Sequence, residues 1–288
     1  MLSVILGFST ALVYGFADFF GAIASRRLRP VLVTGLAGWA GLVLLLGAVA
    51  IGGFHASFTS AAVFWGLLGG IFSTIGLSCL YRALAIGPIS IVSPLSAVVG
   101  GLIPSIVGVA LLGESFGWAK WLALALIFVA VILVAAVKSH SPSRPSLAGV
   151  LFGTGAGLGI AGVLICLHLA PASAGLAPVI LMRAENGIAL GGFMLLLLAT
   201  GRANRSEFNS LGAKMWLAIA ATGMLDATAN VLFVIGSQAG TLTVISVLTA
   251  LYPAGTILLA RFVLKEKLSA VQFTGIVLAL GASLLLAL

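Results

Sequence analysis

Charged side chains are scarce in this sequence. They make up 7% of its 288 residues, whereas soluble globular domains carry roughly 25%. Hydrophobic residues make up 61%, so too few charges remain to build a water-exposed surface. The sequence therefore predicts an integral membrane protein whose main surroundings are the lipid bilayer. In such a protein the net charge of +8 marks cytoplasmic loops, and it does not indicate binding to nucleic acid.

Cysteine and histidine are also rare, and their positions argue against several kinds of function. The two cysteines, Cys79 and Cys166, both lie inside apolar segments and imply no disulfide framework. The three histidines, His55, His140 and His168, are scattered, and neither H-E-x-x-H nor G-x-S-x-G occurs. A filter loop or ring of charges typical of an ion channel is not visible. We therefore expect no metal, no cofactor and no enzymatic activity.

Long polar linkers are missing as well, and the chain consists almost entirely of apolar segments. Each segment has about twenty residues, and a helix of that length crosses the ~30 Å hydrocarbon core of a bilayer. We place ten segments at residues 2–24, 31–51, 61–81, 89–112, 118–137, 147–169, 178–199, 215–235, 241–263 and 268–288. The predicted fold class is an all-α integral membrane protein with ten transmembrane helices.

The sequence repeats itself, and the repeat divides the chain into two halves. Residues 87–114 and 240–266 each open with glycine, contain a proline within an apolar segment, and end at a glutamate. A further apolar segment follows each glutamate, and the Ser/Pro-rich residues 138–146 lie at the joint. We therefore predict a first five-helix repeat at residues 1–139 and a second at residues 146–288.

The odd number of helices in each repeat determines how the halves are arranged. Two five-helix repeats in one chain must enter the membrane with opposite orientations, which makes them an inverted repeat. Transporters with this arrangement place the substrate near the middle of the bilayer, at the interface between the halves. We therefore expect the two repeats to surround a central cavity.

Three features together resemble a known family. They are the paired five-helix repeats, the sequence YGFADF at residues 14–19, and Pro253 thirteen residues before the Glu-Lys-Leu at 266–268. The chain resembles the drug/metabolite transporter superfamily and, within it, the EamA-type exporters, including those of aromatic amino acids. The resemblance covers nearly the whole chain. It implies a secondary transporter that moves small metabolites out of a bacterial cell across the inner membrane.

The basic residues predict the orientation of the chain independently of this resemblance. On one side of the membrane we place Arg26, Arg27, Arg29, Arg82, Lys138, Arg144, Arg202, Arg205, Lys214, Arg261, Lys265 and Lys267. On the other side we place Lys120 alone, with Arg183 inside a span near that face. Loops rich in Lys and Arg stay in the cytoplasm, so both termini are predicted to be periplasmic. The sequence leaves open whether the protein is a monomer or a homodimer.

Asp18, Glu185 and Asp226 are the acidic residues inside the predicted spans. Ionisable groups are costly inside a membrane, so all three are candidates for coupling transport to a proton. Asp226 is predicted either to carry a proton or to bind the ammonium group of a substrate. Glu185 either carries a proton or pairs with a basic residue. The alternative for Asp18 is a carboxylate at the membrane interface, close to Arg26 and Arg27.

Two polar stripes occupy matching places in the two repeats. Thr222 and Asn230 lie four residues on either side of Asp226, on one face of a helix. In the first repeat the matching positions are Thr74 and Ser78. We expect the stripes to face the cavity, with Thr74, Ser78 and Asn230 contacting substrate. The alternative is a structural cluster of hydrogen bonds between helices.

Hydroxyl groups and aromatic rings supply the other predicted substrate contacts. Ser90, Ser93, Thr243 and Ser246 recur at equivalent positions of the two repeats, and Tyr14 and Tyr252 could line an apolar part of the cavity. Each proline in these spans frees a backbone carbonyl that must find another donor. A phosphate site would require converging Lys or Arg. We expect none at mid-membrane, because Arg183 can extend its side chain toward the membrane surface.

These contacts suit a zwitterion or an amide better than a phosphate. The sequence therefore predicts a secondary transporter that exports neutral and aromatic amino acids by alternating access. The first alternative is a permease of the same superfamily for drugs, metabolites or other small solutes. A membrane-embedded enzyme or a channel is the alternative from a different class.

Overall fold

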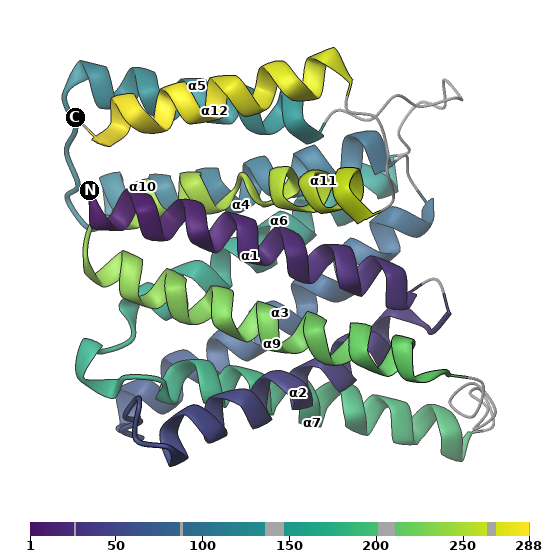
Figure 1. The fold of residues 1–288 in the computed structure, drawn as a ribbon. Helices are drawn as coiled ribbons and strands as arrows, with labels where there is room; N and C mark the ends of the chain where they lie inside the picture. The colour runs from purple at the N-terminus through teal and green to yellow at the C-terminus, as the bar shows by residue number, and fades with distance from the viewer. Residues whose placement is uncertain (26, 87–88, 136–146, 201–210, 264–268, 288) are drawn as a thin grey trace.

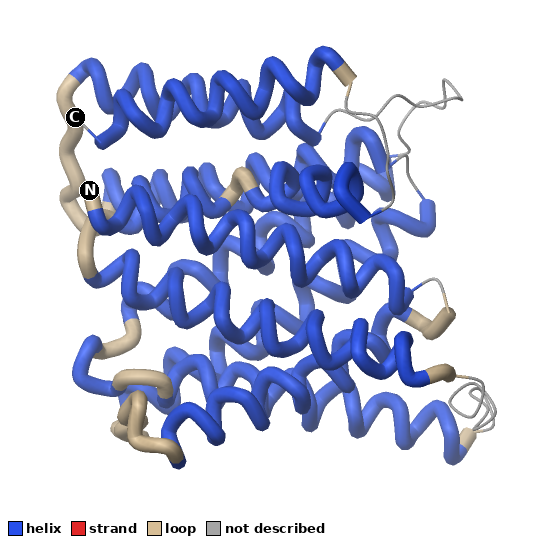
Figure 2. Tube along the Cα trace, in the orientation of Figure 1, coloured by secondary structure: helices blue, strands red, loops and turns tan. Residues whose placement is uncertain are grey.

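The computed structural model describes residues 1–25, 27–86, 89–135, 147–200, 211–263 and 269–287. Apart from one isolated bridge between Ala56 and Gly175, the regular elements of these residues are helices, as Figure 2 shows. In chain order they are α1 Leu2–Ser25, α2 Pro30–Ala50, α3 Ser60–Ile86, α4 Ile89–Ala110, α5 Trp118–Ala135, α6 Leu147–Leu169, the 3-10 turn η1 Ala172–Ala174, α7 Ala177–Ala199, α9 Ala213–Gln238, α10 Leu242–Thr249, α11 Tyr252–Val263 and α12 Ala270–Ala287.

The ten predicted spans are confirmed. Eight helical segments of the described residues are long and apolar enough to cross a membrane, and α10 with α11 counts as one of them. The two shorter apolar helices, Leu95–Ala110 and Ala270–Leu286, complete the set. The protein is therefore a multi-pass membrane protein of the all-helical class. The predicted joint at residues 138–146 lies outside the described residues.

The ninth span is broken in its middle. Helix α10 ends at Thr249, and α11 begins at Tyr252. Pro253 has no N–H to donate to the carbonyl four residues earlier, so a continuous helix would lose that hydrogen bond. Proline is well tolerated in the first turn of a helix, which explains why α11 starts at this point.

The helices form a closed ring of neighbours. In order around the ring, α1 packs on α9, α9 on α2, α2 on α7, α7 on α3, α3 on α6, α6 on α4, α4 on α10, and α10 with α11 on α1. Helices α5 and α12 pack mainly on each other and lie together at one side of the bundle in Figure 1.

The ring has an internal symmetry that relates the two repeats. The contact between α1 and α9 recurs as the contact between α6 and α3, with the roles of the repeats exchanged. Likewise, α4 against α6 recurs as α10 and α11 against α1. Helices α1 and α6 begin at opposite ends of the bundle in Figure 1. These relations are those of two inverted five-helix repeats, as the sequence predicted.

One end of the ring is closed by apolar side chains. Leu164, Leu167, Phe233, Leu242 and Ile245 are at most 2% exposed and pack in one cluster; we call these five residues the apolar plug. They come from the last turns of α6 and α9 and the first turns of α10. Both chain termini lie at this same end in Figure 1. At the opposite end of the ninth span, Arg261, Phe262 and Val263 are exposed.

A carboxylate joins the repeats beside the apolar plug. Glu114, in the loop between α4 and α5, accepts hydrogen bonds from the backbone N–H groups of Leu242 at 2.6 Å and Thr243 at 3.1 Å. The first N–H groups of a helix lack partners within the helix and favour a negative charge. Glu114 therefore caps α10 of the other repeat. Its predicted counterpart, Glu266, lies outside the described residues.

Candidate functional site

Asp18 lies on the face of α1 that points into the ring. Three residues before it, Gly15 packs against α11, and three residues after it, Gly21 packs against Thr222 of α9. Asp18 therefore lies between the two contact directions, on the inner side of the helix. The outer face carries Ile5, a large apolar residue that is 57% exposed. Asp18 is itself exposed, so the interior of the ring is accessible at this depth.

Asp226 lies on the inner face of α9 and forms an ion pair. Its carboxylate Oδ2 pairs with the guanidinium Nη1 of Arg183 from α7. The Arg183 side chain is 8% exposed and passes close to Gly41 of α2, whereas the Asp226 side chain is 28% exposed. A buried charge is costly unless it is paired, and the two residues satisfy this requirement for each other.

Tyr14 and Asn230 tie α1 to α9 next to this ion pair. The Tyr14 hydroxyl donates to Oδ1 of Asn230 at 2.7 Å. The Asn230 amide Nδ2 donates in turn to the backbone carbonyl of Asp226 at 2.7 Å. Asn230 is 1% exposed, so these two bonds account for a buried amide that would otherwise be unpaired. They fix Tyr14 beside the charged groups.

Tyr252 brings the broken span to the same place. It is the first residue of α11, and its side chain hydrogen-bonds Ser96 of α4. Tyr252 also lies close enough to Asp18 to interact electrostatically. Seven residues on five helices of the ring therefore converge. We call them the central polar cluster: Tyr14, Asp18, Ser96, Arg183, Asp226, Asn230 and Tyr252.

Asp18 differs from the other members of the central polar cluster. It makes no hydrogen bond or ion pair to any residue that the structure describes, whereas Asp226 is paired with Arg183. The neighbouring charge that acts on it most strongly is the like-signed carboxylate of Asp226. Asp18 forms no ion pair with Arg27, and Arg26, the other arginine of the interfacial alternative, lies outside the described residues, so that alternative stays open.

Glu185 and Thr74 lie in a separate network between α3 and α7. Thr74 donates its hydroxyl to Oε2 of Glu185 at 3.1 Å, and the Asn186 amide donates to the same oxygen at 3.0 Å. Asn186 also donates to the carbonyl of Gly70 at 3.1 Å and accepts from Ser73 at 3.1 Å. The pattern is that of a structural hydrogen-bond cluster between helices, the alternative left open by the sequence. Asn186, a fully buried amide in an apolar span, was missed.

The remaining predicted contacts are only partly brought together. Ser78 is exposed and donates to the Thr74 carbonyl of its own helix at 2.7 Å. Thr243 donates to the carbonyl of Ser105 at 3.2 Å, which joins α10 to α4. Ser246 is fully buried, and its hydroxyl has no partner among the described residues. The side chains of Ser90 and Ser93 lie outside the described part of the chain.

The expectation for Arg183 is wrong. The sequence suggested a side chain that extends toward the membrane surface, but the structure buries it inside the ring against Asp226. The ion pair compensates the loss of solvation, so extension to the surface is unnecessary. A signal was present, because an arginine inside an apolar span needs a partner of opposite charge. The partner is 43 positions away in the sequence (226 − 183), on another helix, so helical spacing could not identify it.

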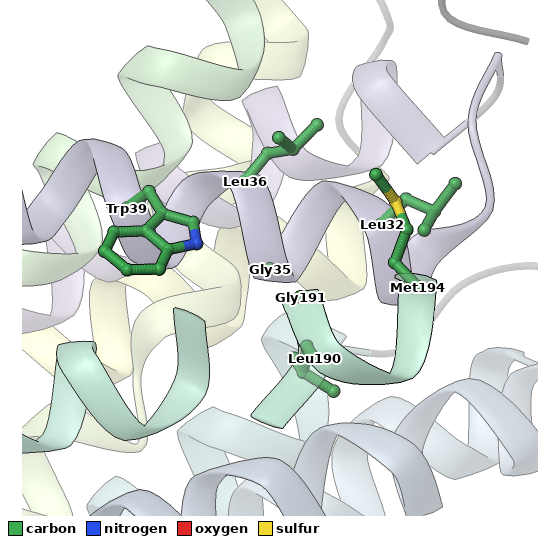
Figure 3. Close-up of a pocket in the computed structure, with 7 residues that line it drawn as sticks. All are labelled: Leu32, Gly35, Leu36, Trp39, Leu190, Gly191 and Met194. Atoms are coloured by element: carbon green, nitrogen blue, oxygen red, sulfur yellow. The ribbon is translucent and has the colours of Figure 1, made fainter. Parts of the chain in front are cut away.

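A hollow of about 100 Å³ lies between α2 and α7. Figure 3 shows its seven lining residues, with Trp39 and Leu36 on α2 and Leu190 and Met194 on α7. The lining is almost entirely apolar, and none of its residues belongs to the central polar cluster. Gly35 and Gly191 let the two helices approach each other here.

The fold and the cluster together define a class of protein. A ring of transmembrane helices built from inverted repeats, with charged groups inside it beside a broken helix, is the construction of a secondary transporter. The sequence profile of the EamA-like transporter family matches residues 1–136 and 147–288. The chain belongs to this family, and it is a small-solute transporter of the drug/metabolite superfamily.

Solved structures show the same fold. Among 29 chains that match, one protein of known crystal structure superposes on this chain with a TM-score of 0.76. The superposition covers 98% of this chain and 95% of the other, with 16% sequence identity. No curated protein matches the sequence.

Proposed function

We propose that the protein exports neutral amino acids, including aromatic ones, by alternating access, and that the substrate binds at the central polar cluster. One observation carries the proposal: groups of both charge signs and two phenol rings meet inside the ring, next to the break between α10 and α11. Broken helices at such positions mark substrate sites in transporters built from inverted repeats.

The chemistry of the cluster matches the parts of an amino acid. Asp18 offers an acceptor for an ammonium group, and it is the carboxylate of the cluster without a partner among the described residues. Arg183 and the phenol hydroxyls of Tyr14 and Tyr252 are donors for a carboxylate. The two phenol rings offer apolar surface and stacking partners for an aromatic side chain.

The buried position of Arg183 removes the argument that no cation lies at mid-membrane, but a phosphate substrate is still disfavoured. A cation does lie inside the ring, yet it is already paired with Asp226, and Asp18 adds a second negative charge. A phosphate group would approach two carboxylates and one arginine, which is an unfavourable balance. A zwitterion, or a solute with a single positive charge, is better suited to this balance.

The orientation predicted by the basic residues is consistent with an inward-open state. The described basic residues Arg27, Arg29, Arg82, Lys214 and Arg261 lie at or near the ends of helices, on the side away from the apolar plug. If that side is cytoplasmic, the plug and both termini are periplasmic. The central polar cluster is then accessible from the cytoplasm, where an exporter of the bacterial inner membrane collects its substrate.

A counterflow assay in liposomes tests the proposed function. Purified protein is reconstituted with unlabelled phenylalanine inside, and transient uptake of labelled phenylalanine is followed. We expect saturable uptake that excess unlabelled neutral amino acids suppress and that a phosphorylated sugar does not. Uptake suppressed by the sugar phosphate alone would contradict the proposal, and a current that rises linearly with voltage would indicate a channel.

A further inference from the structure

The charges inside the ring do not balance, and the imbalance is at Asp18. The central polar cluster contains two carboxylates, Asp18 and Asp226, and one guanidinium, Arg183. Arg183 neutralises Asp226 directly. Asp18 is therefore left with a negative charge that no described residue pairs, on the accessible inner face of α1.

The groups that face Asp18 come from three neighbouring elements. From α9 the facing charge is Asp226, whose guanidinium partner Arg183 belongs to α7. From α11 the facing group is the phenol of Tyr252, and on α1 itself it is the phenol of Tyr14 one turn away. Neither phenol carries a positive charge, and Arg183 is directed to Asp226. A cation that neutralises Asp18 must therefore come from outside the described protein.

Two such cations are available to an amino-acid transporter, a proton and the ammonium group of the substrate. We propose that Asp18 binds these two in turn, never both at once, so that export of substrate is coupled to uptake of a proton. This inference rests on the proposed function. In the step itself, the ammonium group of the substrate meets protonated Asp18, the carboxylic acid releases its proton to water, and a carboxylate–ammonium pair forms.

Competition at one residue is sufficient to give antiport. On the cytoplasmic side substrate displaces the proton, and on the periplasmic side a proton displaces substrate. The inward proton gradient of a bacterial cell therefore drives substrate outward. The exposure of Asp18 allows water and substrate to reach it, and its position on the inner face, away from the exposed Ile5 face, keeps it out of the lipid.

The other two candidate carboxylates are less suited to this exchange. Asp226 already has a cation, and a substrate would first have to break the ion pair to Arg183. Glu185 accepts hydrogen bonds from Thr74 and Asn186 within the α3–α7 network, outside the central polar cluster. The structure therefore favours Asp18 over Asp226 as the coupling residue.

Proton release on binding tests the inference directly. Full-length protein in weakly buffered detergent solution is mixed with phenylalanine, with phenethylamine, which lacks the carboxylate, or with 3-phenylpropionate, which lacks the amine. A pH indicator reports protons, and calorimetry reports binding. We expect phenylalanine and phenethylamine each to release up to one proton per molecule bound. Proton and ligand compete for Asp18, so binding should tighten as the pH rises. While Asp18 is mostly protonated, each apparent dissociation constant should fall about tenfold for every unit of increase in pH.

Two substitutions at Asp18 provide matched variants. D18N removes the charge from an exposed side chain and keeps its size, so we expect a folded protein that releases no proton. Its binding of phenylalanine should be weaker and independent of pH. D18E keeps the carboxylate, and we expect it to restore proton release. E185Q serves as a comparison, because Glu185 lies in the α3–α7 network outside the central polar cluster, and it should still release protons on binding.

The outcomes separate this inference from the proposed function. If phenylalanine binds without releasing protons, or if D18N still releases them, Asp18 is not the shared site although amino-acid binding stands. If phenethylamine binds with proton release and phenylalanine does not bind, the shared site stands and the amino-acid substrate is wrong. If neither amine binds to the wild-type protein, both proposals fail. Because wild-type protein alone gives these readings, the test does not depend on the folding of any variant.

Discussion

The ion pair between Arg183 and Asp226 connects α7 to α9 inside the ring, where the Arg183 side chain is 8% exposed and that of Asp226 28%. Such a pair contributes little net stability compared with apolar residues, but removing one partner leaves an isolated charge in a medium of low dielectric constant. The effect of a substitution therefore depends on whether one or both charges are removed. Loss of one member should be much more harmful than loss of both.

We predict that R183Q lowers the stability of the protein by about 3–5 kcal/mol, since it leaves Asp226 without its cation. The double variant R183Q/D226N should recover most of that loss, because no charge remains unpaired. Thermal unfolding in detergent, followed by tryptophan fluorescence, measures both variants. D18N is the control, and its transition should match that of the wild type because Asp18 has no described partner. Equal stability of the single and double variants would show that an unpaired Asp226 is not the cause of the loss.

The sequence identified candidate functional residues more easily than it identified their interaction partners. Asp18, Glu185 and Asp226 were identified because acidic groups inside apolar segments are rare. Their different surroundings could not be predicted, because each partner comes from another helix. Arg183 and Asn186 decide which carboxylate is neutralised and which is held in a hydrogen-bond network, and both partnerships depend on helix packing. The contacts at Asn230 and Tyr14 depend on the α1–α9 packing for the same reason.

Helix elements pack closely because glycines occupy the crossing points. A Cβ atom added to Gly223 of α9 would overlap the backbone carbonyl of Ala37 on α2. The clash is with backbone, which cannot move aside as a flexible side chain could. By contrast, a Cβ atom on Gly281 of α12 would meet no atom within 4 Å.

These two glycines provide a matched pair of substitutions. We predict that G223A destabilises the protein by about 1–3 kcal/mol, the range found for overpacked sites. G281A should be neutral or should stabilise the protein by up to about 1 kcal/mol, because alanine is the better helix former. Thermal unfolding of the two variants under identical conditions checks the difference. If G281A destabilised the protein more than G223A, the close approach of α2 and α9 at Gly223 would not be important for stability.

At the scale of elements, the apolar runs alone located the spans. The number and order of the ten helices follow from the length of each run, since few polar residues interrupt them. The break between α10 and α11 was harder to predict from the sequence. Prolines do not always interrupt a span, since Pro94 and Pro104 lie within α4, which continues as one helix. Whether a proline interrupts a span depends on what its neighbours can supply to the freed carbonyl, and that information lies in the packing.

The two ends of the molecule differ, because the apolar plug closes one of them and the exposed Asp18 lies in the half of α1 nearer to the other. The apolar plug and the Glu114 cap lie at the end where both termini are found. The repeat pattern predicted the inverted halves, but it could not show which end is closed, because both halves contain the same kinds of residue. That difference is a property of the conformation and of the packing of Phe233 between α6 and α10.

The orientation of the molecule in the membrane can be measured. We predict that the C-terminus is periplasmic, because the helix ends that carry the described residues Arg27, Arg29, Arg82, Lys214 and Arg261 lie at the opposite end. Alkaline phosphatase, which is active only in the periplasm, should be active when fused after Leu288. A fluorescent protein that matures only in the cytoplasm should stay dark at the same position. The reverse result would place the apolar plug on the cytoplasmic side and make the structure outward-open.

The Glu114 cap has a consequence for how fast the molecule can work. We expect opening of the closed end to separate the carboxylate from the N–H groups of Leu242 and Thr243, and charge-assisted hydrogen bonds contribute about 1.5–3 kcal/mol each. Every 1.4 kcal/mol in a barrier is about a tenfold change in rate. We predict that E114Q, which keeps the shape and weakens both bonds, increases the turnover number several-fold while leaving the affinity for substrate unchanged. A carboxylate that does not contact the substrate would then limit the rate of the transport cycle.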